Sequence, residues 1–393
     1  MEKHALIIST VSGFLLKFES DNVSILQDLG YIVHYASNFN EQFYHFRPEE
    51  LEERGIRVHH IDVARSPYQL RTNAVALRQV LDIIRTYDIR LIHCHEPMGG
   101  VLGRLAAAVQ NDPRIKVIYT AHGFHFYKGA PLINNTLYYA AERILAHYTD
   151  ALLLINGEDL ARSRKLKLRS GGIVRLIPGV GLDMDSYYEA DAAAFRAFRQ
   201  SYGIADDAFF LLSVGELNEN KNHLVVLKAL KSLRDRGLLP QELVYGICGE
   251  GFLHQKLEQW CRELGLSEHV CLYGYCVDVR PYICMSNASI FPSKREGLGM
   301  AALESLSMGR PVIASDNRGT REYMRPGENG YLCRWDDPES FAEMILRLHR
   351  MSAQEYEALC RACRPSVTHF SRRTTHQIMT SVYMELDRKV CEE

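Results

Sequence analysis

The string PSKREGLGMAALESLSMGRPVIAS, residues 292–315, has the residue types and spacing best suited to binding an anion. It follows the apolar run ASIF and places Gly297 and Gly299 between a loop and a helical pattern over 300–308. The N–H groups of a first helical turn lack partners within the helix, and the helix dipole adds positive potential there. Glycine at such a junction lets a ligand approach the backbone closely. The string therefore predicts a site for a phosphate or diphosphate group.

Two glutamates of this string, Glu296 and Glu304, are separated by seven residues. Glu304 falls about two turns inside the predicted helix, where its carboxylate would repel a phosphate but could accept two hydrogen bonds from a ribose diol. Glu296 precedes the helix and could accept hydrogen bonds from sugar hydroxyls. The helix dipole favours acidic residues near any helix start, and this is the structural alternative for either glutamate alone. The complete string favours ligand binding.

Alternating strand and helix patterns must position these residues. Short apolar runs are followed by amphipathic stretches such as 74–87, 133–148 and 221–236, in which apolar residues recur at three- and four-residue spacing. This alternation predicts parallel sheets covered by helices on both faces. The predicted strands are 4–9, 32–35, 58–61, 91–94, 116–120, 151–155, 173–177, 209–214, 243–248, 270–272, 289–291, 312–314 and 331–333.

The strand and helix pattern restarts after the segment IPGVGLD, residues 177–183. Its glycine and proline content is typical of a linker between domains, and a polar helix over 190–202 follows it. We therefore predict an α/β protein with two doubly wound, Rossmann-like parallel-sheet domains facing each other across a cleft. Open parallel sheets bind ligands at the carboxyl ends of their strands, so functional residues are expected directly after strands.

Composition indicates a globular protein and argues against a nucleic-acid partner. Lys and Arg total 46 and Asp and Glu 48, so the net charge is −2, without the basic excess typical of nucleic-acid binders. Hydrophobic residues make up 47% of the chain, which excludes a disordered or collagen-like chain. No apolar run approaches the ~18 residues that span a bilayer, and the first ten residues hold only a short apolar run.

Two short motifs have mainly structural interpretations. The ten cysteines lack the regular spacing of a disulfide scaffold, which favours reduced thiols in a cytoplasmic protein. Cys360 and Cys363 form one CxxC without a second pair, so helix-surface thiols are favoured over a zinc site. Asp183 and Asp185 spell DxD, but they fall in the linker and not after a strand that carries chemistry. We therefore expect no metal.

The spacing Glu-x7-Glu in this setting resembles the signature of family-4 glycosyltransferases, retaining enzymes of the GT-B fold. Further strings follow the order of that family in the second half of the chain. The string TAHGFHFYKGAP, 120–131, is similar to bacterial enzymes that build capsules, exopolysaccharides and lipid-linked glycans. The other matching strings are SVGELNENKNH (213–223), GEG (249–251), LYGYCVDV (272–279), PGVGLD (178–183) and RPGENGYL (325–332).

The resemblance implies a separate role for each domain. Residues 1–180 would form an acceptor-side domain and residues 181–365 a nucleotide-sugar-binding domain. Residues 366–393 would form a C-terminal helix that returns to the first domain.

The resemblance also implies roles for individual residues of the second half. Lys221, near the strand-end Gly215, would neutralise the diphosphate leaving group, where an ammonium stabilises growing charge. Glu296 would hold the donor sugar and Glu304 the ribose. Tyr275 belongs to the segment that would hold the base. The backbone of Gly297, Leu298, Gly299 and Met300 would complete the donor site.

Two residues of the first half match the family on shorter strings. Gly13 matches a loop glycine that lets a first helix start point at the phosphate. His122 matches a histidine that contacts the donor sugar near the reaction centre. We therefore expect His122, Lys221 and Glu296 to be catalytic.

One position departs from the family pattern. Many members carry Arg directly after the strand-end glycine, where this chain has Glu216. Arg318, Arg321 or Lys294 would supply the missing cation, or the site relies on Lys221 and backbone amides.

The expected activity is transfer of a hexose or N-acetylhexosamine from a UDP-sugar to a glycan or polyprenyl-diphosphate-linked acceptor, with an α-linkage and without a metal. Two alternatives are a nucleotide-sugar epimerase and a noncatalytic GT-B partner subunit. A dinucleotide dehydrogenase is rejected, because TVSGFLLKF lacks the glycine fingerprint after the first strand.

Two segments bear on the acceptor and on attachment at the inner face of the membrane. Residues 161–170 contain five cations, which indicates either a solvated face or a patch for anionic lipid headgroups. Residues 124–145 are rich in aromatic side chains, which suits either a packed core helix or a membrane-facing surface. Both alternatives remain open at this point.

Overall fold

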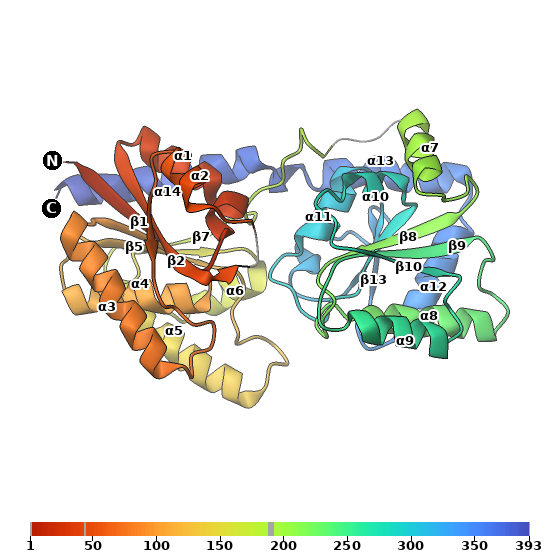
Figure 1. The fold of residues 1–393 in the computed structure, drawn as a ribbon, viewed down its shortest axis with the longest axis horizontal. Coiled ribbons are helices and arrows are strands. Elements are labelled where there is room, and N and C mark those ends of the chain that lie inside the picture. The colour runs from red at the N-terminus through yellow and green to blue at the C-terminus, as the bar shows by residue number, and fades with distance from the viewer. Residues whose placement is uncertain (1, 43–44, 188–191, 393) are drawn as a thin grey trace. The chain divides into compact units, whose positions relative to one another are not determined.

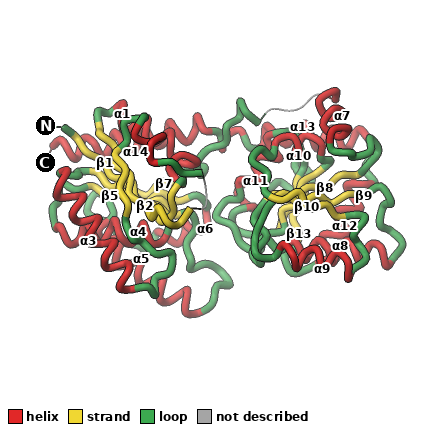
Figure 2. The backbone as a smooth tube through the Cα atoms, in the orientation of Figure 1, coloured by secondary structure: helices red, strands yellow, loops and turns green. Residues whose placement is uncertain are grey.

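The computed structural model describes residues 2–42, 45–187 and 192–392, which divide into two compact units. Unit 1 comprises Met1–Gly181 and Arg372–Glu393, and unit 2 comprises Leu182–Ser371. In each unit the strands lie at the centre and the helices cover them (Figure 2). All thirteen predicted strands are present with slightly shifted ends, and the predicted fold class of two parallel α/β domains is confirmed.

Unit 1 has a seven-stranded sheet of order β3-β2-β1-β4-β5-β6-β7, in which every pair is parallel. Figure 1 shows α3, α4 and α5 on one face, with α1 and α14 on the other. The strands are β1 (Lys3–Ser12), β2 (Tyr31–Gln42), β3 (Arg57–His60), β4 (Leu91–His95), β5 (Lys116–Ala121), β6 (Ala151–Leu154) and β7 (Ile173–Leu176). The helices are α1 (Ser20–Asp28), α2 (Pro48–Glu52), α3 (Leu70–Tyr87), α4 (Pro97–Gln110), α5 (Tyr139–Leu145), α6 (Gly157–Ser163) and α14 (Arg372–Glu392), with short turns η1 (Leu15–Glu19), η2 (Asn134–Tyr138) and η3 (Ala146–Tyr148).

Unit 2 has a six-stranded parallel sheet of order β10-β9-β8-β11-β12-β13. Helices α8, α9 and α12 cover one face, and α10, α11 and α13 cover the other (Figure 1). The strands are β8 (Phe209–Val214), β9 (Leu243–Cys248), β10 (Val270–Gly274), β11 (Ala288–Phe291), β12 (Val312–Ser315) and β13 (Gly330–Cys333). The helices are α7 (Ala192–Ser201), α8 (His223–Asp235), α9 (His254–Glu263), α10 (Arg280–Met285), α11 (Met300–Ser307), α12 (Pro338–His349) and α13 (Ala353–Ser366), with turns η4 (Thr320–Glu322) and η5 (Thr368–Phe370).

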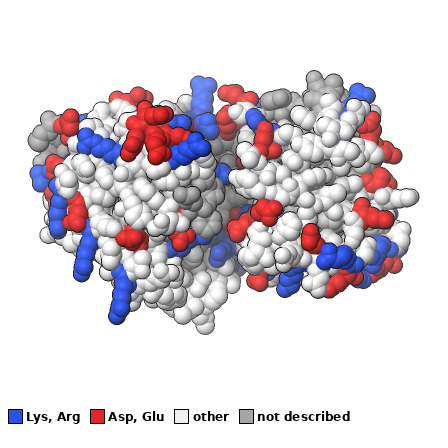
Figure 3. Space-filling model, viewed as in Figure 1, with Lys and Arg blue, Asp and Glu red and all other residues white. Residues whose placement is uncertain are grey.

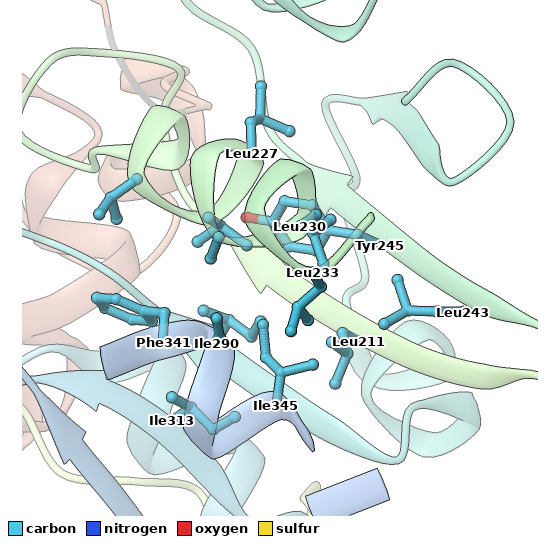
Figure 4. Packing of buried hydrophobic residues seen from close by; sticks show 14 of the residues in the cluster. Leu211, Leu227, Leu230, Leu233, Leu243, Tyr245, Ile290, Ile313, Phe341 and Ile345 are labelled. Carbon is cyan, nitrogen blue, oxygen red and sulfur yellow. The ribbon is translucent and has the colours of Figure 1, made fainter. Parts of the chain in front are cut away.

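The strands read as near-continuous apolar runs because helices bury both faces of each sheet. In unit 2, Leu230 and Leu233 of α8 pack against Leu211 of β8 and Ile345 of α12 in one buried cluster (Figure 4). A comparable cluster lies under α3 and α4 in unit 1. These cores hold the strand ends, and with them the loops that carry the candidate site, in fixed positions.

The last helix, α14, belongs to unit 1 although it follows unit 2 in the chain. It begins at Arg372 and not at residue 366, because η5 ends the preceding segment within unit 2. Asp387 of α14 accepts hydrogen bonds from Lys3 Nζ at 2.8 Å and from Tyr31 Oη at 2.8 Å. The two chain ends therefore lie side by side on unit 1 (Figure 1).

Two predicted helices differ in the structure. The segment 133–148 is divided into η2, α5 and η3, so its helical geometry changes twice within sixteen residues. Within the predicted helix 190–202, α7 begins at Ala192, and residues 190 and 191 lie outside the described residues. No helix among the described residues is both long enough and apolar enough to cross a bilayer.

Candidate functional site

Lys221 lies over the end of β8 in unit 2. A Cβ atom at Gly215 would be 3.2 Å from Lys221 Cε, so the side chain of Lys221 runs across the backbone of this glycine. The Lys221 N–H donates to Asn218 Oδ1 at 3.0 Å, which closes the loop between β8 and α8. Glycine at 215 thus provides the space that the lysine stem occupies.

Lys221 and Glu296 form an ion pair between the loops that follow β8 and β11. Lys221 Nζ is 2.8 Å from Glu296 Oε1, and the two side chains are 22% and 15% exposed. The ammonium also lies 5.2 Å from the centroid of the Phe291 ring, an arrangement that favours a cation. Both loops leave the same edge of the sheet because β8 and β11 are parallel neighbours. The structure therefore brings together two of the three residues that the sequence predicts to be catalytic.

The helix that follows Glu296 begins through a constrained glycine. Gly299 has φ +98° at the N-terminus of α11, and a Cβ atom there would lie 2.8 Å from the Phe291 ring. A Cβ atom at Gly319 would lie 2.8 Å from the carbonyl oxygen of Leu298, so a second loop closes over this turn. Glycine is required at 299 both by the positive φ and by the close approach. Met300 then begins α11, directly after the loop that carries Glu296 and Gly297.

Glu304 lies on α11 and is half-buried. The Tyr187 hydroxyl hydrogen bonds to Glu304, and burial together with the charge of Glu304 raises the pKa of Tyr187 above its ordinary value. The carboxylate for which the sequence predicts a ribose diol therefore already accepts a hydrogen bond from the Tyr187 hydroxyl. Tyr187 was missed at the sequence level, because nothing in the linker marks it as a partner of a residue more than a hundred positions away.

The remaining predicted residues of unit 2 differ in exposure. Tyr275 follows β10 and is 67% exposed, and Glu216 follows Gly215 and is exposed. Arg318 is buried, and its Nε donates to the backbone oxygen of Glu296 at 3.3 Å. Arg321 pairs with Asp316, while Lys294 lies over the Trp335 ring. Arg318 therefore contacts the backbone of Glu296 directly.

Asparagines on both sides of Lys221 tie the two loops together. Asn220 Nδ2 donates to the Arg295 carbonyl oxygen at 2.9 Å, and the Lys294 N–H donates to the Asn220 carbonyl oxygen at 2.8 Å. Asn222, at φ +58°, donates to the carbonyl oxygens of Pro292 and Trp335 at 3.1 and 2.8 Å. The alternation N-E-N-K-N could have predicted these positioning residues. Asparagine tolerates a left-handed backbone, and its side chain hydrogen bonds to nearby backbone groups.

Gly13 and His122 lie at strand ends of unit 1. Gly13 has φ +78° directly after β1, and Lys17 N–H donates to its carbonyl oxygen at 3.3 Å. His122 follows β5 and lines a small pocket together with Glu19 and Thr120. Burial lowers the pKa of His122 to about 4, so the imidazole is neutral at pH 7.

Sequence reasoning missed two residues beside His122. Buried His95, the last residue of β4, has Nδ1 at 3.4 Å from His122 Nε2 and at 3.4 Å from Glu19 Oε1. The pattern His-x-His at the end of a buried strand was the available signal for His95. No pattern marks Glu19 in the sequence, because its segment, LLKFES, is typical of an ordinary helix start.

One trio among the described residues has donor atoms within 4.8 Å of one another: Glu19, His93 and His95. Both ring nitrogens of His93 already hydrogen bond to hydroxyls, of Tyr383 at 2.7 Å and of Thr120 at 2.8 Å. This arrangement does not fit a metal ligand. In the DxD string, Asp183 accepts hydrogen bonds from the N–H and hydroxyl of Ser186, so it closes a turn.

Family models match both halves of the chain. A model described as "Glycosyl transferases group 1" matches residues 194–362, and one described as "Glycosyl transferase 4-like" matches residues 3–156. EpsD of Bacillus subtilis (strain 168), whose name places it among the glycosyltransferases, is 36% identical over 397 residues, covering 99% of both chains. UDP-Gal:alpha-D-GlcNAc-diphosphoundecaprenol alpha-1,3-galactosyltransferase of Escherichia coli is 28% identical over 264 residues, covering 67% of this chain and 66% of its own.

Solved structures share the fold at low identity. Anabaena Alr3699/HepE in complex with UDP and glucose has a TM-score of 0.76 at 16% identity, covering 98% of this chain and all of its own. Sucrose-phosphate synthase (tll1590) from Thermosynechococcus elongatus has a TM-score of 0.80 at 18% identity with the same coverage. At this identity the likeness concerns the fold alone.

The Asn222 contacts predict a measurable stability effect in unit 2. Asn222→Gly keeps the left-handed backbone but removes two hydrogen bonds, which should cost about 1–3 kcal/mol of unfolding free energy. Asn222→Ala should cost about 1 kcal/mol more, because alanine is strained at this φ. Urea unfolding checks both values, with exposed Glu219→Ala as the control expected within about 0.5 kcal/mol of the parent. Equal stability of the Ala and Gly variants would contradict the backbone argument.

Proposed function

Since the chain belongs to the family-4 glycosyltransferases of the GT-B fold, we propose that it transfers a sugar from a UDP-sugar with retention of configuration. The sugar is a hexose or N-acetylhexosamine, and the product carries an α-linkage. The observation that carries the proposal is the pairing of Lys221 with Glu296 beside the N-terminus of α11. This arrangement places one cation, one carboxylate and a helix start within reach of a single nucleoside-diphosphate sugar.

The diphosphate is the leaving group in this proposal. Lys221 and the first N–H groups of α11 stabilise the negative charge that grows as the bond from the anomeric carbon to the diphosphate oxygen breaks. The acceptor oxygen bonds to the same face of the anomeric carbon, and its proton passes to the departing diphosphate. These residues supply the positive charge without a metal ion. Arg318, which donates to the backbone oxygen of Glu296, adds a second cation in place of the arginine that Glu216 replaces.

The two glutamates hold different parts of the donor. Glu296 accepts hydrogen bonds from hydroxyls of the transferred sugar, next to the diphosphate held by Lys221. Glu304 accepts hydrogen bonds from the ribose hydroxyls, which replace the hydrogen bond from the Tyr187 hydroxyl. Tyr275, exposed after β10, borders the base. The family resemblance assigns Gly13 to the phosphate and His122 to the donor sugar.

The acceptor is a glycan or a glycan on a polyprenyl diphosphate, in the assembly of a surface polysaccharide. The E. coli relative names such an acceptor, a sugar on diphosphoundecaprenol, and a UDP-linked donor. We assign the acceptor to unit 1, with α14 as its last helix, and the donor to unit 2. A lipid-linked acceptor requires the enzyme to work at a membrane surface.

Two exposed features of unit 1 suit the cytoplasmic face of an anionic membrane. Leu132, Ile133 and Leu137 are 83%, 61% and 51% exposed at the start of the segment that includes η2 and α5. In the segment 161–170, Arg162 and Arg169 pair with acids, whereas Arg164, Lys165 and Lys167 are exposed. Figure 3 shows both signs of charge interspersed on the visible face, so attraction to a membrane would depend on such local groups and not on net charge.

Nucleotide binding tests the role of Lys221. We expect UDP at a hundredfold excess over its Kd to stabilise the protein by about 2.7 kcal/mol. Lys221→Met should weaken UDP binding at least tenfold, which removes about 1.4 kcal/mol of that stabilisation. The matched control is Lys228→Met, at an exposed position on α8. This variant should keep the full stabilisation by UDP. Thermal unfolding with and without UDP gives both values. An unchanged UDP shift in Lys221→Met would place the phosphate site elsewhere, and no shift in the parent would favour a noncatalytic subunit.

Matched amide variants separate the two glutamates. Glu296→Gln should lower kcat about 100-fold or more with UDP affinity within about threefold of the parent, because it contacts the sugar and not the nucleotide. Glu304→Gln should instead weaken UDP binding about tenfold, because an amide accepts only part of the ribose hydrogen bonds. Radiolabelled sugar transfer and UDP titration measure the two effects. The reverse pattern would exchange the two assignments.

Vesicle binding tests the membrane surface. Replacing Arg164, Lys165 and Lys167 by Gln should cost about 3 kcal/mol of binding to vesicles of phosphatidylglycerol and phosphatidylcholine. Raising the salt should release the parent protein, because exposed charges are screened. Leu132→Ser with Ile133→Ser should weaken binding without changing its salt dependence. Co-sedimentation measures each case, and equal binding by all variants would leave both segments as solvated surface.

A further inference from the structure

Glu96, between β4 and α4 of unit 1, has a backbone conformation that residues with a side chain avoid. Its φ is +62° and its ψ is 166°, a region occupied almost only by glycine. The other non-glycine residues with positive φ in the described part of the chain are Asp88, Asn111 and Asn222. Their ψ values of 49°, 32° and 35° place them in the left-handed helical region, which Asp and Asn tolerate. The strain at Glu96 is therefore of a different kind.

Close packing of α4 against β1 makes the turn at Glu96 sharp. A Cβ atom at Gly99 would lie 3.2 Å from the Ile8 carbonyl oxygen and 3.4 Å from Ser9 Cα, so the first turn of α4 lies directly on the strand. Pro97 follows Glu96 at the start of the helix, and a residue before proline is restricted to extended ψ values. Glu96 therefore combines an extended ψ with a positive φ where the chain passes from β4 into α4.

The side chain of Glu96 bonds to the end of β1 and not to the helix that it precedes. It makes no capping hydrogen bond with α4. Its Oε2 accepts a hydrogen bond from the Thr10 N–H at 2.7 Å, and the carboxyl group also accepts from the Thr10 hydroxyl and the Val11 N–H. Glycine at this position would remove the strain but could make none of these bonds. The strained backbone therefore retains a side chain whose hydrogen bonds go to β1.

The end of β1 is irregular and is held by side chains. Its pairing with β2 shifts register on both sides of Val11. The Val11 carbonyl oxygen accepts hydrogen bonds from Ser9 Oγ at 2.9 Å and from Tyr35 Oη at 3.0 Å, while its N–H bonds to Glu96. Side chains thus fix both backbone groups of Val11. Gly13 lies two residues further on, at φ +78°, so the start of the loop after β1 depends on these bonds.

We propose that Glu96 is a positioning residue that fixes the end of β1, and with it the loop that begins at Gly13, in spite of the backbone strain in its own turn. The family resemblance assigns Gly13 to the phosphate of the donor, so the expected effect on turnover rests on the proposed function. The expected effect on the backbone of residues 10–17 does not. If packing of α4 alone required the strain, glycine at 96 would relieve it without loss of order in β1.

Hydrogen exchange of the full-length protein without ligand tests the positioning directly. In Glu96→Gly, the peptide that covers residues 10–17 should exchange at least about tenfold faster than in the parent, because the Thr10 and Val11 N–H groups lose their acceptor. Glu96→Gln keeps an amide oxygen for the Thr10 N–H and should stay within about threefold. Asn111→Gly, at the other end of α4, is the matched control and should exchange like the parent. Exchange at the parent rate in Glu96→Gly would overturn the proposal.

Urea unfolding tests whether the turn is strained. Glu96→Gly should unfold at a higher urea concentration than Glu96→Ala, because both variants lack the carboxyl group and only alanine keeps the strained conformation. An alanine variant as stable as the glycine variant would contradict the strain on which the proposal depends. If Glu96→Gly does not fold, Glu96→Leu takes its place in the exchange measurement, because leucine keeps the side-chain volume and has no acceptor.

Turnover extends the test to the reaction. Glu96→Gly should lose about 100-fold in kcat, because small displacements of a positioned group have effects of this size. Its Kd for UDP should stay within about threefold, because the nucleotide binds to unit 2, and Glu96→Gln should recover at least about tenfold of the lost kcat. Parent-like turnover in Glu96→Gly would overturn the proposal. Absence of sugar transfer in the parent protein would count against the proposed function, and hydrogen exchange of residues 10–17 would still decide the role of Glu96.

Discussion

The ion pair between Lys221 and Glu296 is the interaction on which the candidate donor site depends. It joins two loops that are 75 residues apart in the chain and leave neighbouring parallel strands. A half-buried ion pair gives back much of its Coulombic gain in desolvation, so it requires support from its surroundings. The asparagines on either side of Lys221 provide that support through hydrogen bonds to the backbone of the Glu296 loop. The pair holds a cation and a carboxylate at the same strand edge.

Close backbone approach at glycines makes this geometry attainable. A Cβ atom at Gly249 would lie 1.9 Å from the Gly215 carbonyl oxygen, and one at Gly251 would lie 2.5 Å from that of Leu217. The turns after β8 and β9 therefore pack backbone against backbone. The same principle applies at Gly299, where the start of α11 lies against the Phe291 ring. Side chains at these positions would move the loops apart and separate Lys221 from the helix start.

The glutamates at the strand ends of the two units have different surroundings. In unit 2, the carboxylate of Glu296, whose side chain is 15% exposed, is paired with the ammonium of Lys221. In unit 1, Glu19 is buried beside neutral imidazoles, and burial without a cation favours the protonated acid. One edge therefore suits the charged diphosphate, whereas the other suits uncharged hydroxyl groups. This difference follows from the partner that each carboxyl group meets, because Glu296 and Glu19 are chemically the same.

The sequence by itself determined the class of fold, the order of the strands and the string that carries Glu296 and Glu304, because these depend on local periodicity and on glycines at one loop. It also indicated Lys221 and His122 as residues that follow strands. Tertiary structure alone decided that Lys221 meets Glu296, that the Tyr187 hydroxyl hydrogen bonds to Glu304, and that Arg318 contacts the backbone of Glu296. It alone placed Glu19 and His95 beside His122. These contacts join residues far apart in the chain, and their distances are set by strand pairing and by helix packing on the sheet, which no local pattern records.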